Sequence, residues 1–187
     1  HIDPFGPEDG RNANKGGVAR RASLVQSIRN ENPNTLLLDA GDIFQGTPYF
    51  NFFGGELELK LMSEMKYDAA TIGNHDFDGG IDALKRQLKH ANFQFISSNY
   101  DFKNTVLKED VKPYQIFKKG DLKIGILGIG IELEGLVPKN LYKETQYLNP
   151  IEKANQTANI LKNDEKCDLV ICLSHLGFKY QTDKVDD

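Results

Sequence analysis

The sequence predicts an α/β fold in which helices cover layered, mixed sheets whose strands are mostly parallel. Short apolar segments alternate along the chain with segments whose apolar residues recur every three or four positions. With 39% hydrophobic and 27% charged residues, the composition is that of a globular domain rather than a disordered or fibrous chain. The length of 187 residues, without a repeat or linker, fits one domain over residues 1–187.

Three helices are predicted in the first half of the chain, the first and third of them from apolar residues at helical spacing. The second of them covers residues 56–65, and the first ends ahead of Pro33, whose ring cannot continue a helix. The stripes that define the first and third helices are Val18, Ala22, Val25 and Ile28, and Ile81, Leu84, Leu88 and Ala91.

A fourth helix is marked by its N-terminus. Asn149 is a favourable N-cap, Pro150 suits the first helical position, and Glu152 stands where a capping box places an acid. The apolar face expected for this helix consists of Ile151, Ala154, Ala158 and Leu161.

Six short segments predict strands, at residues 35–39, 69–72, 93–97, 114–118, 122–127 and 168–173. The turn Lys119-Gly120-Asp121 joins the fourth and fifth of them as a hairpin. The other strands are separated by helical segments, so we expect them to run parallel.

Charge, hydropathy and cysteine spacing exclude several classes of function. The 23 basic and 27 acidic residues give a formal net charge of −4 without a basic stripe, which argues against a nucleic-acid groove. No apolar run approaches the roughly twenty residues that a transmembrane segment needs. Cys167 and Cys172 bracket a predicted strand and therefore lie too far apart to form a disulfide with each other. Leu133 occupies the third glycine position of a dinucleotide fingerprint after Gly128 and Gly130, which disfavours a Rossmann cofactor site.

Polar residues follow several of the predicted strands, at the edge where open α/β sheets bind ligands. Asp42 follows the first strand, Asn74, His75 and Asp78 follow the second, and His175 follows the last. Each residue alone has an ordinary structural explanation, such as a turn or a satisfied histidine. Their arrival at one edge favours a site of mixed oxygen and nitrogen ligands, which suits Mn, Fe or Zn.

These residues belong to a set of ordered motifs. The motifs are Leu38-Asp39-Ala40-Gly41-Asp42 with Gln45-Gly46-Thr47, Tyr67-Asp68-Ala69, Gly73-Asn74-His75-Asp76-Phe77-Asp78, and Ser174-His175-Leu176-Gly177. Together they resemble the N-terminal metallophosphoesterase (calcineurin-like) domain of the 5′-nucleotidase family, in the family's order and over residues 16–177. Asp76, Ser174 and Gly177 are interpreted as scaffolding.

The resemblance implies hydrolysis of 5′-nucleotides to nucleoside and phosphate with two divalent metal ions of the Mn, Zn or Fe type. Asp42 resembles the carboxylate that bridges the two ions, and Asn74 and His175 resemble ligands of the second ion. His75 resembles the catalytic histidine, and Asp78 resembles its orienting partner. No residue is assigned to binding the rest of the substrate.

The chain also departs from the family pattern. The family's first strand, which ends in Asp-x-His, and its downstream Gly-His-x-His block have no counterpart here, and His1 is expected just past the ligand histidine. The family's C-terminal nucleotide-binding domain has no counterpart in this sequence either. We expect such a domain as a partner, in cis or as a separate chain. We therefore expect a layered fold that is incomplete at both termini. We also expect the chain alone to be catalytically incompetent and to self-associate through its uncovered sheet edges.

Other functions remain open at this point. The same metal chemistry serves a 2′,3′-cyclic nucleotide phosphodiesterase or a nucleotide-sugar hydrolase. The missing Asp-x-His motif also allows a non-catalytic binding module derived from such an enzyme. By resemblance alone, the expected location is periplasmic or extracellular.

Overall fold

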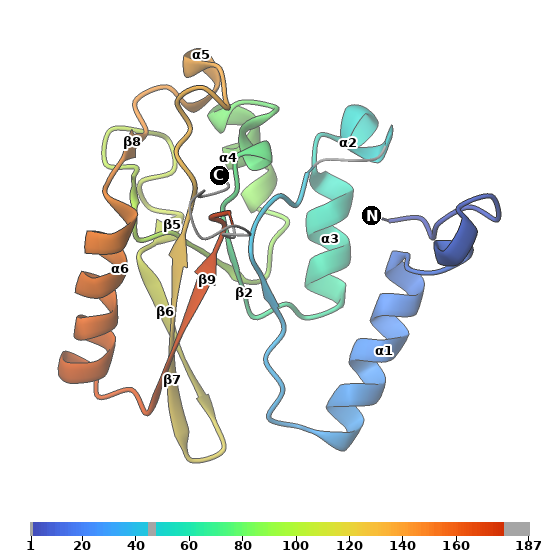
Figure 1. Cartoon of the computed structure of the whole chain (residues 1–187), viewed down its shortest axis with the longest axis horizontal. Helices are drawn as coiled ribbons and strands as arrows, with labels where there is room; N and C mark the ends of the chain where they lie inside the picture. Colours follow the sequence, from blue (N-terminus) through green and yellow to red (C-terminus); the bar gives the residue numbers. More distant parts are fainter. Residues whose placement is uncertain (1, 45–47, 178–187) are drawn as a thin grey trace, which may run out of the picture.

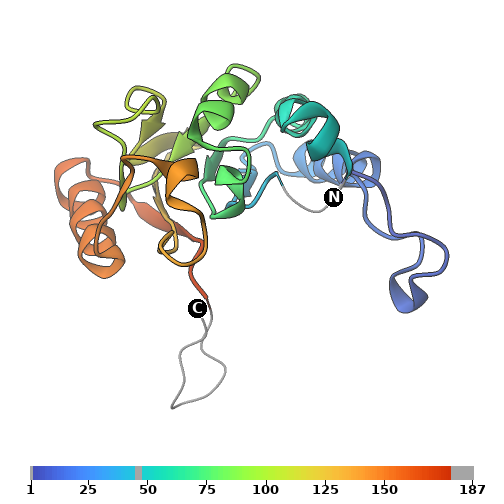
Figure 2. The same cartoon turned by 90° about the horizontal axis from the view of Figure 1, so that it is seen from above.

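The computed structural model describes residues 2–44 and 48–177. His1, residues 45–47 of the first motif and residues 178–187 lie outside the described part of the chain. The described elements form four layers, in which helices flank a pair of stacked sheets (Figures 1 and 2). This arrangement confirms the layered α/β fold predicted from the sequence.

Two main sheets stack on each other. The first is parallel throughout, with the order β1-β2-β3-β5: β1 (Leu38–Asp39), β2 (Ala69–Thr71), β3 (Gln94–Ile96) and β5 (Val111–Lys112). The second pairs the hairpin β6 (Tyr114–Lys119) and β7 (Leu122–Ile129) with β9 (Leu169–Ser174), which runs parallel to β7. A small antiparallel pair consists of β4 (Tyr100–Asp101) and β8 (Gln146–Tyr147).

The predicted helices form the two outer layers. α1 (Val18–Glu31), α3 (Glu56–Glu64) and α4 (Ile81–Leu88) lie on the side of the parallel sheet, and α6 (Pro150–Asn159) covers the second sheet (Figure 1). Shorter helical elements are α2 (Pro48–Phe53), α5 (Lys139–Tyr142), the 3₁₀ turns η1 (Gly10–Asn12) and η2 (His75–Phe77), and the π-helical turn η3 (Ile160–Asp164).

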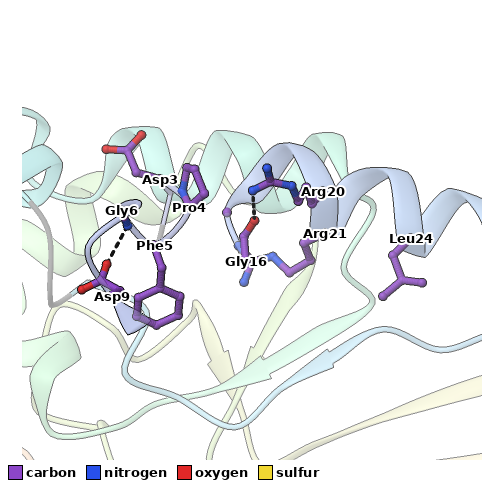
Figure 3. Close-up of a pocket in the computed structure, with 10 residues that line it drawn as sticks. Asp3, Pro4, Phe5, Gly6, Asp9, Gly16, Arg20, Arg21 and Leu24 are labelled. Carbon is purple, nitrogen blue, oxygen red and sulfur yellow. Dashed lines mark hydrogen bonds between the residues drawn. The ribbon is translucent and has the colours of Figure 1, made fainter. Parts of the chain in front are cut away.

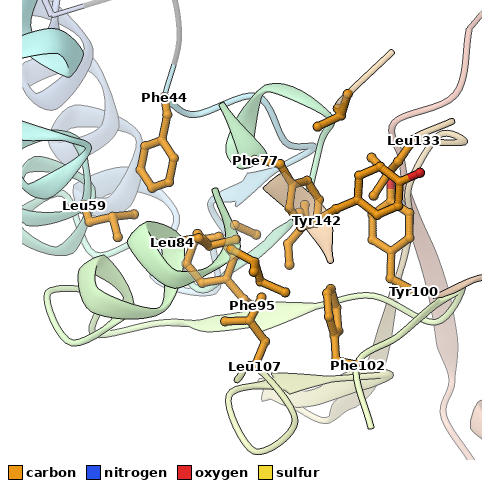
Figure 4. Close-up of a cluster of buried hydrophobic side chains, with 14 of the residues drawn as sticks. Phe44, Leu59, Phe77, Leu84, Phe95, Tyr100, Phe102, Leu107, Leu133 and Tyr142 are labelled. Atoms are coloured by element: carbon orange, nitrogen blue, oxygen red, sulfur yellow. The ribbon is translucent and has the colours of Figure 1, made fainter. Parts of the chain in front are cut away.

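Neighbouring residues of the central strands face different cores. Ala70 and Phe95 belong to the cluster under α3 and α4, part of which Figure 4 shows. Ala69 and Ile96 point the other way and pack with Ile126 between the two sheets. Side chains alternate across a strand, so one short run of apolar residues fills two cores at once.

The first core also anchors the two loops that follow β1 and β2. Phe44 is 2% exposed and lies two residues beyond Asp42, and Phe77 is 0% exposed and lies two residues beyond His75. Both rings are seen in Figure 4 among the buried side chains. The loops that carry the candidate site are therefore held by packing close to their polar residues.

Two sequence expectations are corrected here. Only Leu38–Asp39 of the segment predicted as a strand joins the sheet. Just ahead of it, the N–H of Leu37 donates to the Asp68 carboxylate (2.8 Å). Ile151 is 70% exposed rather than part of the buried face of α6. It lies in the first turn, beside the cap, where Asn149 accepts the N–H groups of Ile151 and Glu152 at 3.0 Å as the sequence predicts. The two cysteines are unpaired, as expected.

Candidate metal centre

Three loops that follow parallel strands meet at one edge of the stacked sheets. β1 runs parallel to β2, so the loop that carries Asp42 lies beside the loop that carries Asn74. In the second sheet, β9 ends just before His175, whose backbone N–H donates to the carbonyl of Ile129 at the end of β7 (2.8 Å). The edge therefore gathers polar residues from both sheets, as expected for the carboxyl ends of parallel strands.

The side chains of Asp42, Asn74 and His175 converge at this edge. Nε2 of His175 lies 3.3 Å from Oδ2 of Asp42 and 3.2 Å from Oδ1 of Asn74. The His175 side chain is 19% exposed and that of Asp42 is 31% exposed, so the group is accessible without being fully solvated. The structure thus brings together the three residues that the sequence proposes as metal ligands.

Both ring nitrogens of His175 face hydrogen-bond acceptors. Nδ1 donates to the carbonyl of Ala40 (2.7 Å), and Nε2 faces the carboxylate and amide oxygens described above. The hydrogen bond to the Asp42 carboxylate raises the pKa of His175, against the opposing effect of burial. Because the Ala40 carbonyl fixes the proton on Nδ1, Nε2 of the neutral ring is the nitrogen that remains to bind a metal. Two oxygens and one imidazole nitrogen around one point form a donor set that fits a divalent transition metal.

Asp42 is held in its charged form. Burial opposes ionisation, but the hydrogen bonds from His175 and from the backbone N–H of His75 (2.9 Å to Oδ1) lower the pKa of Asp42. Metal ligands must be deprotonated to bind, so this electrostatic environment favours a cation at Asp42.

The backbone at this edge leaves no room for ordinary side chains. Asp42 itself has a φ of 62°, which is uncommon outside glycine. A Cβ at Gly73 would lie 2.2 Å from Oδ1 of Asp42 and 2.8 Å from Cε1 of His175. A Cβ at Gly41 would lie 2.6 Å from the backbone nitrogen of Gly73. The two glycines therefore allow the candidate ligands to approach each other.

His75 and Asp78 form a pair beside the candidate ligands. They lie one turn apart around η2, and Nδ1 of His75 is 3.0 Å from Oδ2 of Asp78. The side chains are 34% and 33% exposed, which leaves them accessible to a substrate. The carboxylate fixes the orientation of the imidazole, which is the arrangement proposed for a catalytic histidine and its partner.

Asp76 is the polar residue of this edge whose contacts the sequence did not reveal. It is 1% exposed, and its carboxylate accepts three backbone N–H groups: those of Ile43 (2.8 Å), Gly73 (2.8 Å) and Asp42 (3.1 Å). Burial raises the pKa of Asp76 to about 7, although these N–H groups favour its charged form. Its place inside the motif of residues 73–78 was the available signal, but spacing alone does not show which backbone groups it meets.

A pocket of about 630 Å³ lies elsewhere, between the N-terminal segment and the first turns of α1 (Figure 3). Phe5, Leu24, Arg20 and Arg21 are among the residues that line it, and Nη1 of Arg20 donates to the carbonyl of Gly16 (3.3 Å). None of the five candidate site residues lines this pocket. This pocket and the convergent polar residues at the sheet edge therefore lie at different places in the described chain.

The sequence of residues 1–187 matches the calcineurin-like phosphoesterase family. The chain belongs to that family. It is 38% identical over 167 residues to a snake venom 5′-nucleotidase of Crotalus adamanteus, covering 87% of this chain and 28% of the relative. It is 33% identical over 192 residues to the trifunctional nucleotide phosphoesterase protein YfkN of Bacillus subtilis, covering 88% of this chain and 13% of the relative. The crystal structure of a 5′-nucleotidase precursor from Thermus thermophilus matches with a TM-score of 0.82 at 35% identity, covering 87% of this chain and 32% of that one.

Membership of the calcineurin-like phosphoesterase family confirms the predicted resemblance and the predicted fold. The chain spans about 28% of the length of the venom relative. None of the helices in the described ranges is long and apolar enough to cross a membrane. Within those ranges, no three His, Cys, Asp or Glu side chains are grouped so as to hold a metal ion. The set at the sheet edge combines one carboxylate and one imidazole with the amide of Asn74.

Proposed function

We propose that the protein hydrolyses 5′-nucleotides to nucleoside and phosphate with the help of two divalent metal ions of the Mn, Zn or Fe type. The observation that carries the proposal is the convergence of Asp42, Asn74 and His175 beside the His75–Asp78 pair. Membership of the phosphoesterase family and the 5′-nucleotidase names of two of its relatives support the same reaction.

Asp42, Asn74 and His175 are the proposed metal ligands. Asp42, whose carboxylate offers two oxygens, would hold both ions, and Asn74 and His175 would hold the second. The neutral amide of Asn74 adds a ligand without a further negative charge facing the phosphate. When bound, two such ions activate the attacking water at neutral pH and neutralise the charge of the phosphate.

His75 is the proposed catalytic residue. Its partly exposed ring stands beside the ligand set, from where it can stabilise the transferring phosphoryl group or give a proton to the departing alkoxide. Asp78 accepts from Nδ1 at 3.0 Å and holds the ring in one orientation. Asp78 is therefore proposed to act through His75 rather than on the substrate.

Phosphate release from AMP by the intact protein in the presence of Mn²⁺ tests this proposal. We expect wild-type protein to be active and Asp42→Asn and His175→Ala to lose activity. Asp121→Asn, an exposed carboxylate in the β6–β7 turn, is the matched control and keeps full activity. An inactive wild type in the presence of Mn²⁺ would instead favour a non-catalytic module.

A second substrate class is favoured by one specific finding, the relative named a trifunctional nucleotide phosphoesterase. The residues proposed here address metal ions and a phosphoryl group, and they do not distinguish a monoester from a cyclic nucleotide or a nucleotide sugar. Comparing kcat/KM for AMP, a 2′,3′-cyclic nucleotide and a nucleotide sugar separates the alternatives. We expect AMP to be preferred.

Location and partner domain are also proposals. The venom relative is consistent with a periplasmic or extracellular protein, which fractionation of cells expressing the intact protein would check. The chain covers less than a third of that relative, so we propose that a C-terminal domain, in cis or as a separate chain, binds the nucleoside part of the substrate.

A further inference from the structure

We propose that Asp76 is a positioning residue that holds the loops after β1 and β2 in register and thereby sets the geometry of the candidate metal centre. The inference rests on the proposed function and deepens it. Asp76 is not proposed to touch a metal ion or a substrate.

The carboxylate of Asp76 joins two loops that come from different strands. From the loop after β1 it accepts the N–H of Asp42 at Oδ2 (3.1 Å) and that of Ile43 at Oδ1 (2.8 Å). From the loop after β2 it accepts the N–H of Gly73 at Oδ2 (2.8 Å). Both oxygens are used, and the two loops that they join carry the candidate ligands Asp42 and Asn74.

This link lies where the sheet no longer connects the two segments. The β1–β2 ladder pairs Leu38 with Ala69 and Asp39 with Ala70. Beyond those pairs, Asp42 adopts a φ of 62°, a conformation that persists only when its surroundings enforce it. The hydrogen bond from the N–H of Asp42 to Asp76 supplies such a restraint directly at the strained residue.

A carboxylate is the side chain that suits this position. Asp76 is 1% exposed, so water cannot readily replace it as the acceptor. Both carboxylate oxygens of Asp76 accept backbone N–H groups, whereas the amide of an asparagine would place an NH₂ group against at least one of these donors. The neighbouring Phe77, at 0% exposed, anchors the backbone from which Asp76 projects.

Backbone amide hydrogen exchange on Asp76→Asn tests the link without a metal ion. In this variant, we expect the exchange rate of at least one of the amides of Ile43, Gly73 and Asp42 to rise about tenfold or more. The exchange rates of the β7 amides should remain as in wild type. Asp68→Asn is the matched control, because Asp68 accepts a backbone N–H from Leu37 (2.8 Å) at the opposite end of β2. That control should leave the three amides unchanged.

Mn²⁺ titration of the same variants tests the consequence for the candidate centre. Asp76→Asn should bind Mn²⁺ roughly 10–100-fold more weakly than wild type, and Asp68→Asn should bind as wild type does. Unchanged exchange at all three amides, or uniformly faster exchange over the whole chain, would overturn the positioning role. Equal Mn²⁺ affinity in Asp76→Asn and wild type would overturn it too. If wild type binds no Mn²⁺, the proposed metal function is overturned, and so is the claim that Asp76 sets the geometry of a metal centre. Faster exchange confined to these amides in Asp76→Asn would then still support the link between the two loops.

Discussion

Three side chains of the candidate centre, those of His175, Asp42 and His75, are each oriented by a hydrogen bond to a group outside the proposed ligand set. The carbonyl of Ala40 holds the ring of His175, the backbone N–H of His75 holds the carboxylate of Asp42, and Asp78 holds the ring of His75. Such supporting contacts place functional atoms before any ligand arrives, which lowers the cost of binding and reaction.

His75→Ala separates the proposed catalytic role from metal binding. Removing a general acid typically costs roughly 10²–10⁴-fold in rate, so AMP hydrolysis by the intact protein should fall by that range in kcat. Mn²⁺ affinity should change little, because the His75 ring is not among the proposed ligands. Full activity in this variant would remove His75 from the mechanism.

Gly73→Ala tests the close approach of the candidate ligands. The added Cβ would lie 2.2 Å from Oδ1 of Asp42, so the carboxylate or the loop must move. We expect Mn²⁺ affinity to fall roughly 10–100-fold, measured by calorimetric titration. Gly79→Ala is the control, since the nearest atom to its Cβ would be that of Ala83 at 3.3 Å. Unaltered affinity in Gly73→Ala would show that Asp42 is not a ligand in this position.

At the scale of single elements, α6 illustrates how local sequence chemistry defines a helix. Oδ1 of Asn149 accepts the N–H groups of Ile151 and Glu152, both at 3.0 Å, and Pro150 occupies the first turn. The helix places Ala154 and Ala158 against the second sheet, together with Leu161 of the following turn η3, while Ile151 in the first turn stays exposed.

Asn149→Ala should therefore lower the free energy of unfolding by about 1 kcal/mol, because two N–H groups lose their acceptor. Urea unfolding of this variant, compared with Asn155→Ala in the exposed middle of α6, measures the effect. The Asn155 variant should be as stable as wild type or slightly more stable, since alanine has the higher helix propensity. Equal stability of the two variants would argue against the cap.

The elements that could be predicted from the sequence were those with a local signal. The hairpin β6–β7 follows from its turn, α1 and α4 follow from their apolar spacing, and α6 follows from its N-cap and apolar face. The two-residue strands β4, β5 and β8 have no such signal, because their pairing depends on tertiary contacts. Gly128 was recognised only as a poor match to a cofactor motif. In the structure its missing Cβ would lie 2.4 Å from Oγ1 of Thr71, so this glycine lets the two sheets pack closely.

The candidate site was predictable as far as strand ends could locate it. Asp42, Asn74 and His175 each follow a strand, and parallel strands bring such positions to one edge. The role of Asp76 could not be predicted, because its partners are backbone N–H groups at very different separations along the sequence. Two of them lie more than thirty positions away and the third lies three positions away. Motif spacing carries no information about such contacts.

At the scale of the whole molecule, the free edge of the second sheet is expected to govern association. In the described part of the chain, β9 forms one of the two edges of the order β6-β7-β9, and Leu169 at its start is 46% exposed. A six-residue edge strand with apolar side chains is a template for pairing with another chain.

We expect the 187-residue chain to self-associate with rising concentration in sedimentation velocity, and Leu169→Lys to reduce this association. Leu122→Lys is the matched control, since Leu122 is 52% exposed but lies at the start of β7, beside the hairpin turn. A chain that stays monomeric at every concentration would show that the edge is not available for pairing.

Mn²⁺ titration of wild type and His175→Ala tests the central claim most directly, namely that the strand-end residues form a metal centre. The account predicts that wild type binds Mn²⁺ and that His175→Ala loses this binding while its helices and sheets, followed by circular dichroism, are retained. Binding of Mn²⁺ with the same affinity in both proteins, or no binding by wild type, would contradict it.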